Sequence, residues 1–416
     1  MKSLLLATLI TLPAFAGPSV NATNKMGLKL ALEAAQKEKG NYMVSPLSLM
    51  QALNLAANGT DHGTRAEVET LLGADLAILN ADSAQLVKKI SLSPEEKKTL
   101  EAQNNWVHPA VVGIHNSIWN TNGATDNARF TFSPEFKNIA ATHFNAESKT
   151  LDFKKAESVK AINGWADKKT NGLVKEIINA DTLKDLLWIV MNATYIESNW
   201  SESMRLVTRS VPVFTLENGE KTTPAMIEGK QYIAHKEFEG GSVVASLPFS
   251  SAPGKAQLEM VIYLPALGTK LDSARAKFFS HNFWLNSVQG ILAERREEAR
   301  IVLPKFSFDT SVEMKKDDEI TKNLGLNFLF SNFADFTRMA TADSYTSAVG
   351  LIKQNTRIEL DEKGVKAAAV TIIGGVRTTS MPVEPRLSLT VDRPFLFAIV
   401  EKQSQAILFA GSVLKP

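Results

Sequence analysis

Apolar positions along the chain recur with helical spacing in some segments and with strand-like character in others. Between Ser45 and Leu55 the spacing is helical, and Ser45 or Ser48 can cap the helix that this predicts. A second helix is expected over residues 158–178. Residues 186–200 form an apolar stretch rich in strand-forming residues, which indicates a central buried strand. Both helices and buried strands are therefore expected along the chain.

A different pattern lies near the C-terminus. Every second residue from Val365 to Ile373 is small or apolar, so one face of an extended strand could enter a packed interior. Gly364 in front and Gly374-Gly375 behind interrupt the helix that three consecutive alanines would favour. The segment therefore has the pattern of a latent strand. A polar apex follows it at residues 377–380, and such a tip suits a protease.

Two motifs in this region resemble the serpin family of protease inhibitors. The sequence E-K-G-V-K-A-A-A-V-T at residues 362–371 is similar to the loop hinge of inhibitory members, and D-R-P-F-L-F at residues 392–397 is similar to the strand that follows. About ten motifs stand in the family's order, ending with I-L-F-A-G-S-V-L-K-P at the C-terminus. The resemblance covers essentially the whole mature sequence, and we expect a secreted bacterial member.

The resemblance implies an α+β serpin fold with three β-sheets, about eight or nine helices and an exposed reactive-centre loop at about residues 362–385. No linker, repeat or low-complexity stretch divides the chain, so we expect a single domain over residues 17–416. The loop hinge implied by the resemblance consists of Glu362, Gly364, Val365, Ala367, Ala368, Ala369 and Thr371.

The function implied is irreversible suicide-substrate inhibition, in which a protease cuts the loop and the loop inserts into the large sheet and traps the acyl-enzyme. The alternative is a non-inhibitory serpin that acts as a binding or carrier protein. Residues 362–371 contain no proline and no bulky charged block to insertion, which favours the inhibitor. We expect trypsin-like or elastase-like serine proteases as partners, with a cysteine protease as a further candidate, and a monomer that binds neither nucleic acid nor membrane.

Two positions compete for the reactive bond. The family's usual register, counted from Glu362, places Thr378 before the bond and Thr379 after it. A loop shorter by one residue places Arg377 before the bond instead. Arginine suits a trypsin-like pocket that carries an aspartate, whereas threonine suits an elastase-like enzyme. Both readings stay open.

The resemblance further implies a polar cluster beneath the point where the large sheet opens, made of Ser45, Ser48, Asn192 and Gln354. It places Trp200 at the end of the sheet where insertion begins. Each residue taken alone could equally be an ordinary cap, strand or core residue. Gln354 stands where many members have histidine, and an amide there keeps its charge state at every pH.

The N-terminal residues and the composition indicate where the protein acts. Residues 1–16 have the pattern of a secretory signal, with Lys2 in front, an apolar run from Leu4 to Leu12, and Ala14-Phe15-Ala16 before cleavage. We therefore expect a secreted or periplasmic protein. The chain has no cysteine, so disulfides are excluded. With 44% hydrophobic and 22% charged residues and a net charge of +2, it shows no bias toward polyanions.

Motifs for catalysis are absent from the sequence. The six histidines form no H-E-x-x-H, and neither a G-x-S-x-G elbow nor a phosphate-binding G-x-x-x-x-G-K occurs. The only S-x-x-K motif, Ser412 to Lys415, sits at the extreme C-terminus. We therefore expect no enzymatic activity, no catalytic residues, no cofactor and no metal.

Overall fold

The computed structural model describes residues 17–104, 108–122, 130–183, 186–341, 351–366 and 385–416. The predicted signal segment lies outside these residues. The helices of six residues or more in the described part are α1 (Pro18–Lys37), α2 (Pro46–Ala57), α3 (His62–Leu72), α4 (Leu76–Ile90), α5 (Pro94–Gln103), α6 (Pro134–Phe144), α7 (Ala156–Lys169), α9 (Leu271–Phe278) and α12 (Glu319–Leu324). Shorter helical segments are α8 (Ala180–Leu183), α10 (His281–Phe283), η1 (Trp284–Val288) and α11 (Gln289–Ala293). The expected number of principal helices is confirmed.

The described residues form three sheets, as expected. The nine-stranded sheet has the order β1 (Tyr42–Val44), β17 (Ile407–Val413), β16 (Phe395–Glu401), β10 (Leu258–Leu264), β9 (Ser242–Pro248), β8 (Met226–Phe238), β11 (Glu297–Pro304) and β15 (Leu387–Thr390), with β5 (Met204–Leu206) also paired to β8. The six-stranded sheet has the order β12 (Phe306–Met314), β13 (Ile352–Leu360), β14 (Gly364–Lys366), β4 (Trp188–Asn199), β2 (Val111–Thr121) and β3 (Glu147–Leu151). The strands β6 (Phe214–Thr215) and β7 (Lys221–Thr222) form a separate two-stranded sheet.

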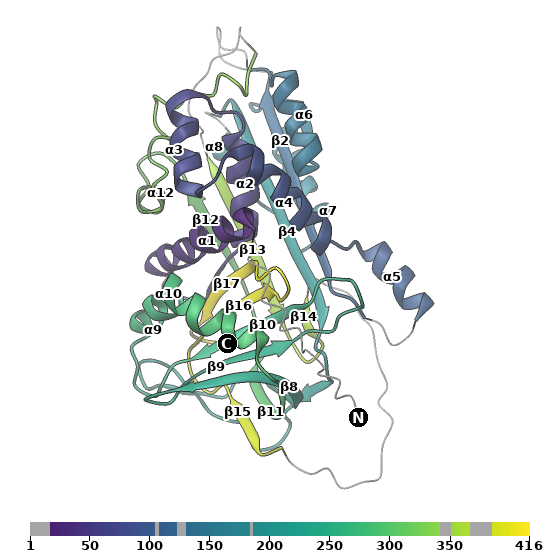
Figure 1. Cartoon of the computed structure of the whole chain (residues 1–416), viewed down its shortest axis with the longest axis vertical. Coiled ribbons are helices and arrows are strands. Elements are labelled where there is room, and N and C mark those ends of the chain that lie inside the picture. The colour runs from purple at the N-terminus through teal and green to yellow at the C-terminus, as the bar shows by residue number, and fades with distance from the viewer. Residues whose placement is uncertain (1–16, 105–107, 123–129, 184–185, 342–350, 367–384) are drawn as a thin grey trace, which may run out of the picture.

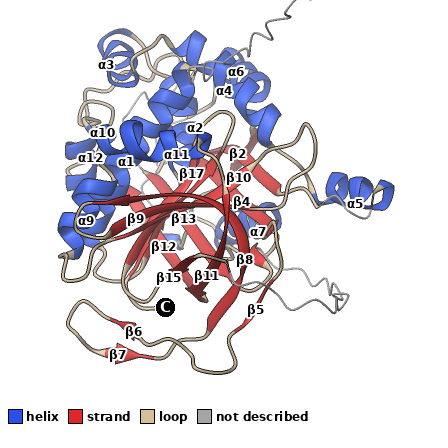
Figure 2. Cartoon of the chain, turned by 60° about the horizontal axis from the view of Figure 1, so that its bottom comes forward, coloured by secondary structure: helices blue, strands red, loops and turns tan. Residues whose placement is uncertain are grey.

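The helix α2 lies between the two large sheets and contacts β4 of one and β17 of the other. All twelve of its residues are buried. Its N-cap is Ser45, whose side chain accepts a hydrogen bond from the Ser48 backbone N–H, so the predicted capped helix is confirmed. Figure 2 shows most helices gathered on one side of the strands, with α5 projecting away from the others.

Two predicted elements differ in how well they match the structure. The central strand expected at residues 186–200 is confirmed as β4, which pairs along its length with β2 (Figure 1). The helix expected to run to residue 178 ends earlier, because α7 stops at Lys169. Asn171 and Gly172 then adopt positive φ angles of 54° and 85°, which end the helix and turn the chain. The residues beyond form an irregular segment that crosses the sheet.

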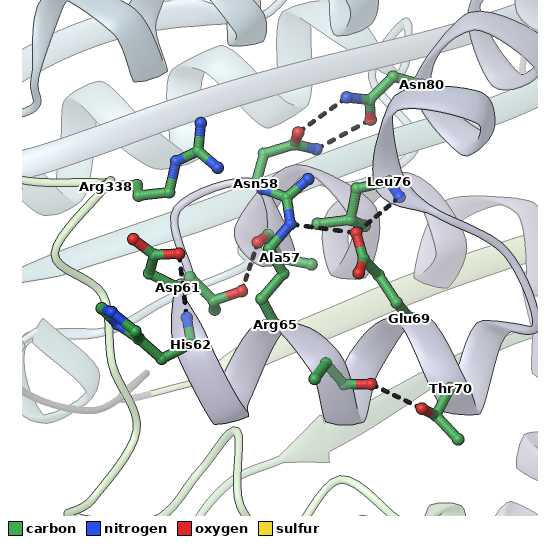
Figure 3. A network of polar contacts seen from close by, with 12 residues as sticks. Ala57, Asn58, Asp61, His62, Arg65, Glu69, Thr70, Leu76, Asn80 and Arg338 are labelled. Atoms are coloured by element: carbon green, nitrogen blue, oxygen red, sulfur yellow. Dashed lines mark hydrogen bonds and ion pairs between the residues drawn. The ribbon is translucent and has the colours of Figure 1, made fainter.

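Polar contacts join α2, α3 and α4 at one end of the molecule (Figure 3). Asn58, after α2, and Asn80, in α4, exchange two hydrogen bonds of 2.8 and 2.7 Å between buried amides. Glu69 in α3 accepts from Arg65 and from the Leu76 backbone N–H, both at 3.0 Å. These contacts fix the helices against one another. In the described residues, no helix is both long enough and apolar enough to cross a membrane.

Candidate functional site, the slot between β4 and β13

The chain places β14 between β13 and β4 in the six-stranded sheet (Figure 1). Val365 lies opposite Leu360 of β13 on one side and opposite Ser198 of β4 on the other. The Val365 side chain is only 4% exposed and joins the apolar cluster under the sheet. The first residues of the predicted latent strand therefore already occupy the sheet as a short central strand.

Glycine is the only residue type that fits at position 364, where β14 starts. Its φ of 144° is one that L side chains rarely adopt. A Cβ atom there would lie 2.0 Å from the carbonyl oxygen of Ser198 and 2.8 Å from the Cα of Asn199. The close approach lets the chain enter the gap beside β4 immediately after its turn.

Trp200 lies where β14 enters the sheet. Its indole Nε1 donates to the backbone oxygen of Asp361 at 2.9 Å, and its backbone N–H donates to the oxygen of Lys363 at 3.0 Å. The ring is 5% exposed and stacks on Phe249, with ring centroids 4.9 Å apart. Trp200 therefore fixes the turn that precedes the hinge.

Glu362 anchors the same turn from the other side. Its carboxylate pairs with the Lys305 ammonium at 2.8 Å, and both side chains are about one third exposed. The hydrogen bond from Lys305 holds the pKa of Glu362 below its ordinary value, despite partial burial. Sequence analysis did not find Lys305, because the pair joins segments 57 residues apart.

The remaining loop residues named above lie outside the described residues. These are Ala367, Ala368, Ala369 and Thr371 of the hinge and Arg377, Thr378 and Thr379 at the reactive bond. The described chain resumes at Pro385 and enters β15, which runs parallel to β11 at the edge of the nine-stranded sheet. The loop thus leaves from one sheet and returns to another.

Three of the four residues of the expected polar cluster meet beneath β13. The Gln354 amide donates from Nε2 to the Ser45 carbonyl and accepts at Oε1 from the Ser45 N–H, both at 2.7 Å. The Ser45 hydroxyl donates to the Leu408 carbonyl at 2.7 Å and also caps Ser48. Because a primary amide matches a peptide group in both roles, Gln354 satisfies this backbone without a titratable ring.

Asn192 belongs to a second network. It lies directly opposite Asn116 in the β2–β4 pair, and its Nδ2 donates to the Asn116 Oδ1 at 2.8 Å. Asn116 in turn donates to the Phe144 carbonyl at 2.9 Å, while Thr194 donates to Asn192 at 2.7 Å. No hydrogen bond between described residues connects Asn192 with Ser45, Ser48 or Gln354, so the expected single cluster is corrected to two. The polar partner directly across the strand pair satisfies Asn192 locally.

The segment after α7 spans the slot. The helix packs on β4 through a cluster that contains Ile162 and Met191, whereas Glu176 further along accepts a 3.0 Å hydrogen bond from the Asn355 side chain of β13. A cavity of about 830 Å³ lies between residues 172–176 and the faces of β12 and β13. Between the described residues, this side-chain hydrogen bond ties the crossing segment to the far wall of the slot. Sequence analysis missed Asn355, whose strand position gave no signal for this contact.

Comparison with known proteins agrees with this architecture. The family profile described as Serpin (serine protease inhibitor) matches residues 21–416. Serpin-Z2A from Triticum aestivum is 27% identical over 408 residues, which is 96% of each chain. Arabidopsis AtSerpin1 in its native stressed conformation is similar in structure, with a TM-score of 0.77 and 23% identity over 96% of this chain and 98% of that one. The thermophilic serpin tengpin in its native state gives a TM-score of 0.76 and 23% identity over 95% and 94%. The chain therefore belongs to the serpin family.

Proposed function

We propose that this serpin is an irreversible suicide-substrate inhibitor of serine proteases. A protease cuts the reactive loop, the freed arm inserts into the slot between β4 and β13, and the acyl-enzyme is trapped. The observation that carries this proposal is β14, because Val365 of the hinge already pairs with both walls of the slot and Gly364 pairs with β4. A sheet that accepts the first residues of the arm as a central strand has the geometry to accept the rest.

The free energy available is large enough for the proposed distortion of the protease. If about ten to twelve loop residues become a strand and each added hydrogen bond contributes about 1 kcal/mol, the gain is on the order of 10 kcal/mol. One oxyanion-hole contact is worth only about 3 kcal/mol to a protease. Displacing a catalytic group by about 1 Å costs roughly a hundredfold in rate. Insertion can therefore disable deacylation.

We propose a trypsin-like or elastase-like serine protease as the partner, with cleavage after Arg377 or Thr378 respectively. A cysteine protease is a further candidate, and we propose that the inhibitor acts as a monomer. An arginine at position 377 favours the trypsin-like pocket, whereas the register from Glu362 favours Thr378. The pattern of residues 1–16 supports export, so we propose a secreted or periplasmic protein of bacterial origin.

Incubation with a trypsin-like and an elastase-like protease tests the proposal. We expect an SDS-resistant complex with at least one of them and loss of that protease's activity. The mass of the released C-terminal peptide identifies the bond, since it begins at Thr378 if Arg377 precedes the cut and at Thr379 if Thr378 does.

A hinge variant is the matched control. Ala369→Pro leaves the reactive bond intact but removes a strand hydrogen bond, so the loop should be cut while the protease stays active. The proposed function is wrong if every protease cleaves the unmodified protein as a simple substrate and remains active. That outcome would favour the binding or carrier alternative.

A further inference from the structure

The side chain of Arg275, in α9, is buried beside the last turn of α1. The residue is only 6% exposed, although a guanidinium carries its charge at every pH at which a protein is folded. The helix α1 contacts α9 and also the strands β1 and β17 (Figure 1). A buried charge is costly unless nearby groups compensate it, so the contacts of Arg275 decide whether this one is satisfied.

The contacts that Arg275 makes with the protein are long. Its Nη1 donates to the Ala35 carbonyl at 3.5 Å and to the Asp272 carboxylate at 3.2 Å, and its Nη2 donates to the Ser412 hydroxyl at 3.3 Å. Hydrogen bonds from a charged nitrogen to a carboxylate are ordinarily about 2.7–2.9 Å long. The Nε atom is buried and has no hydrogen-bond partner among the described residues. The guanidinium is therefore incompletely paired.

Asp272 is a weak counter-charge for this guanidinium. The Asp272 side chain is 94% exposed, whereas that of Arg275 is 7% exposed. Water surrounds the carboxylate and screens its charge, so the pair does little to compensate the buried cation. No other carboxylate in the described part of the chain lies within ion-pair distance of Arg275. Most of the positive charge therefore stays uncompensated inside the protein.

Two buried hydroxyl groups belong to the residues around the guanidinium. Tyr42 of β1 and Ser412 of β17 lie directly opposite each other in the strand pair, and both are 0% exposed. The Arg275 guanidinium lies over the Tyr42 ring, 5.4 Å from its centroid. The Tyr42 hydroxyl has no hydrogen-bond partner among the described residues. Burial raises the pKa of Tyr42, although Arg275 and Ser412 oppose the shift, so the hydroxyl keeps its proton and remains a donor.

Buried donors that surround a cation and lack acceptors have the chemistry of an anion site. We propose that Arg275, Tyr42 and Ser412 bind a small monovalent anion, chloride. The Arg275 Nε and the Tyr42 hydroxyl donate to the ion, and the Ser412 hydroxyl, which accepts from Nη2, can turn its proton toward it. The low exposure of all three residues favours a single ion over an organic acid. None of them belongs to the hinge or the slot, so this inference does not depend on the proposed inhibitory function.

Thermal melting of the full-length mature protein tests the site, with sodium chloride replacing sodium gluconate at constant ionic strength. We expect a saturable rise in the melting temperature of about 2 °C, because an ion that binds only the folded chain stabilises it. Arg275→Met and Tyr42→Phe should each reduce this rise at least twofold.

A surface variant tests the same site without changing the core. Asp272→Asn removes the carboxylate that competes with chloride for Arg275, so half of the rise should be reached at a chloride concentration at least twofold lower. Because the Asp272 side chain is exposed, this variant stays informative if Arg275→Met does not fold. An unchanged midpoint would contradict the proposal.

Arg393→Met is the matched control, because the Arg393 guanidinium has short contacts, with the Pro265 carbonyl at 2.8 Å and with Asp392 at 2.6 Å. It should change the melting temperature equally in both salts. Crystals grown with bromide in place of chloride locate the ion, since its anomalous scattering should give a peak beside the Arg275 guanidinium. The proposal is overturned if chloride gives no rise over gluconate, if folded Arg275→Met or Tyr42→Phe keeps the full rise, or if no bromide peak lies beside Arg275.

Discussion

The two large sheets differ in how completely their strands are paired. In the nine-stranded sheet, β10 pairs with β9 and with β16 through six residues on each side. In the six-stranded sheet, β13 pairs with β12 through nine residues but with β14 through only two. On the other wall of the slot, β4 pairs with β2 through ten residues and with β14 through two. One sheet is complete, and the other lacks most of a central strand.

This difference shows where the fold retains unused free energy. Strand pairing is stabilising when donors and acceptors meet in the interior, and in the described chain most of β13 and β4 has no partner inside the slot. An added strand there breaks no strand pair between described residues, although β13 and β4 approach each other along part of the slot and must move apart to admit it. The nine-stranded sheet has no comparable reserve, since another strand at its centre would have to separate existing pairs.

Cleavage of the reactive loop should produce the largest effect. Insertion of the freed arm completes the six-stranded sheet and adds on the order of 10 kcal/mol. We expect the melting temperature, measured by circular dichroism or calorimetry, to rise by roughly 10 °C or more.

The control for this experiment is a cut that completes no sheet. A protease site engineered in the turn of the β6–β7 hairpin, near Gly219, allows a single nick elsewhere on the surface. That nick should leave the melting temperature unchanged or lower it. An equal rise after both cuts would show that chain cleavage itself, rather than completion of the sheet, stabilises the protein.

Lowering the pH should reduce the stability of the folded protein through His115 of β2. Burial lowers the pKa of His115 from 6.5 to about 4, with Lys169 adding to the shift and Glu147 opposing it. Between these values the unfolded chain binds a proton that the folded chain does not, so stability falls as the pH falls. The loss begins near pH 6.5, is complete near pH 4, and amounts to roughly 3 kcal/mol.

Urea unfolding between pH 7 and pH 4 measures this loss. His115→Gln removes the titrating ring and should reduce the pH dependence by about the amount that His115 contributes. If His115→Gln keeps the original slope, other groups carry the acid sensitivity.

Sequence alone predicted the elements whose residues signal locally. The capped helix α2 and the apolar strand β4 were predicted because capping and hydrophobic runs depend on neighbours in the chain. The end of α7 was placed too late, since apolar spacing continued past Asn171 while the backbone turned. The Asn171-Gly172 pair was the local signal for that turn, and apolar spacing alone overlooked it.

At the hinge, too, the local pattern was predicted and the long-range contacts were missed. The small-residue pattern predicted that Val365 could enter the sheet, and its burial confirms this. The pair of Glu362 with Lys305 and the bond from Asn355 to the Glu176 carbonyl were missed, because each joins segments far apart in sequence. The split of the polar cluster was missed for a similar reason, since it depends on the register that sets Asn192 opposite Asn116.

Two glycine-to-alanine substitutions compare the sheets directly. At Gly411 in β17 a Cβ would lie 2.1 Å from the Tyr42 carbonyl oxygen of β1, inside a fully paired sheet. Gly411→Ala should therefore destabilise the protein by about 1–3 kcal/mol in urea unfolding. At Gly364 the clash with the Ser198 oxygen is as close, but β14 can withdraw. Gly364→Ala should therefore cost about the worth of the contacts that β14 gives up, among them two hydrogen bonds from Trp200, or roughly 2 kcal/mol.

Tryptophan fluorescence distinguishes withdrawal from a tolerated clash. When β14 leaves the slot, Trp200 loses its bonds to Asp361 and Lys363 and becomes more exposed, so its emission should shift to the red in Gly364→Ala but not in Gly411→Ala. Equal destabilisation by both substitutions, without a spectral shift, would mean that β14 is held as firmly as a strand of the complete sheet.

Asn355→Ala should have the smallest effect and acts on the crossing segment. It removes the hydrogen bond from the Asn355 side chain to the Glu176 carbonyl, worth about 1 kcal/mol, while leaving β13 paired with β12. Insertion must displace the segment, so after rapid cleavage of the loop the slow change in Trp200 fluorescence should accelerate up to about fivefold. Lys353→Ala on the same strand breaks only a pair with Glu313 of β12 and should leave that rate unchanged. Equal rates in Asn355→Ala and the unmodified protein would show that the segment moves aside after the rate-limiting step, and that the slot alone governs insertion.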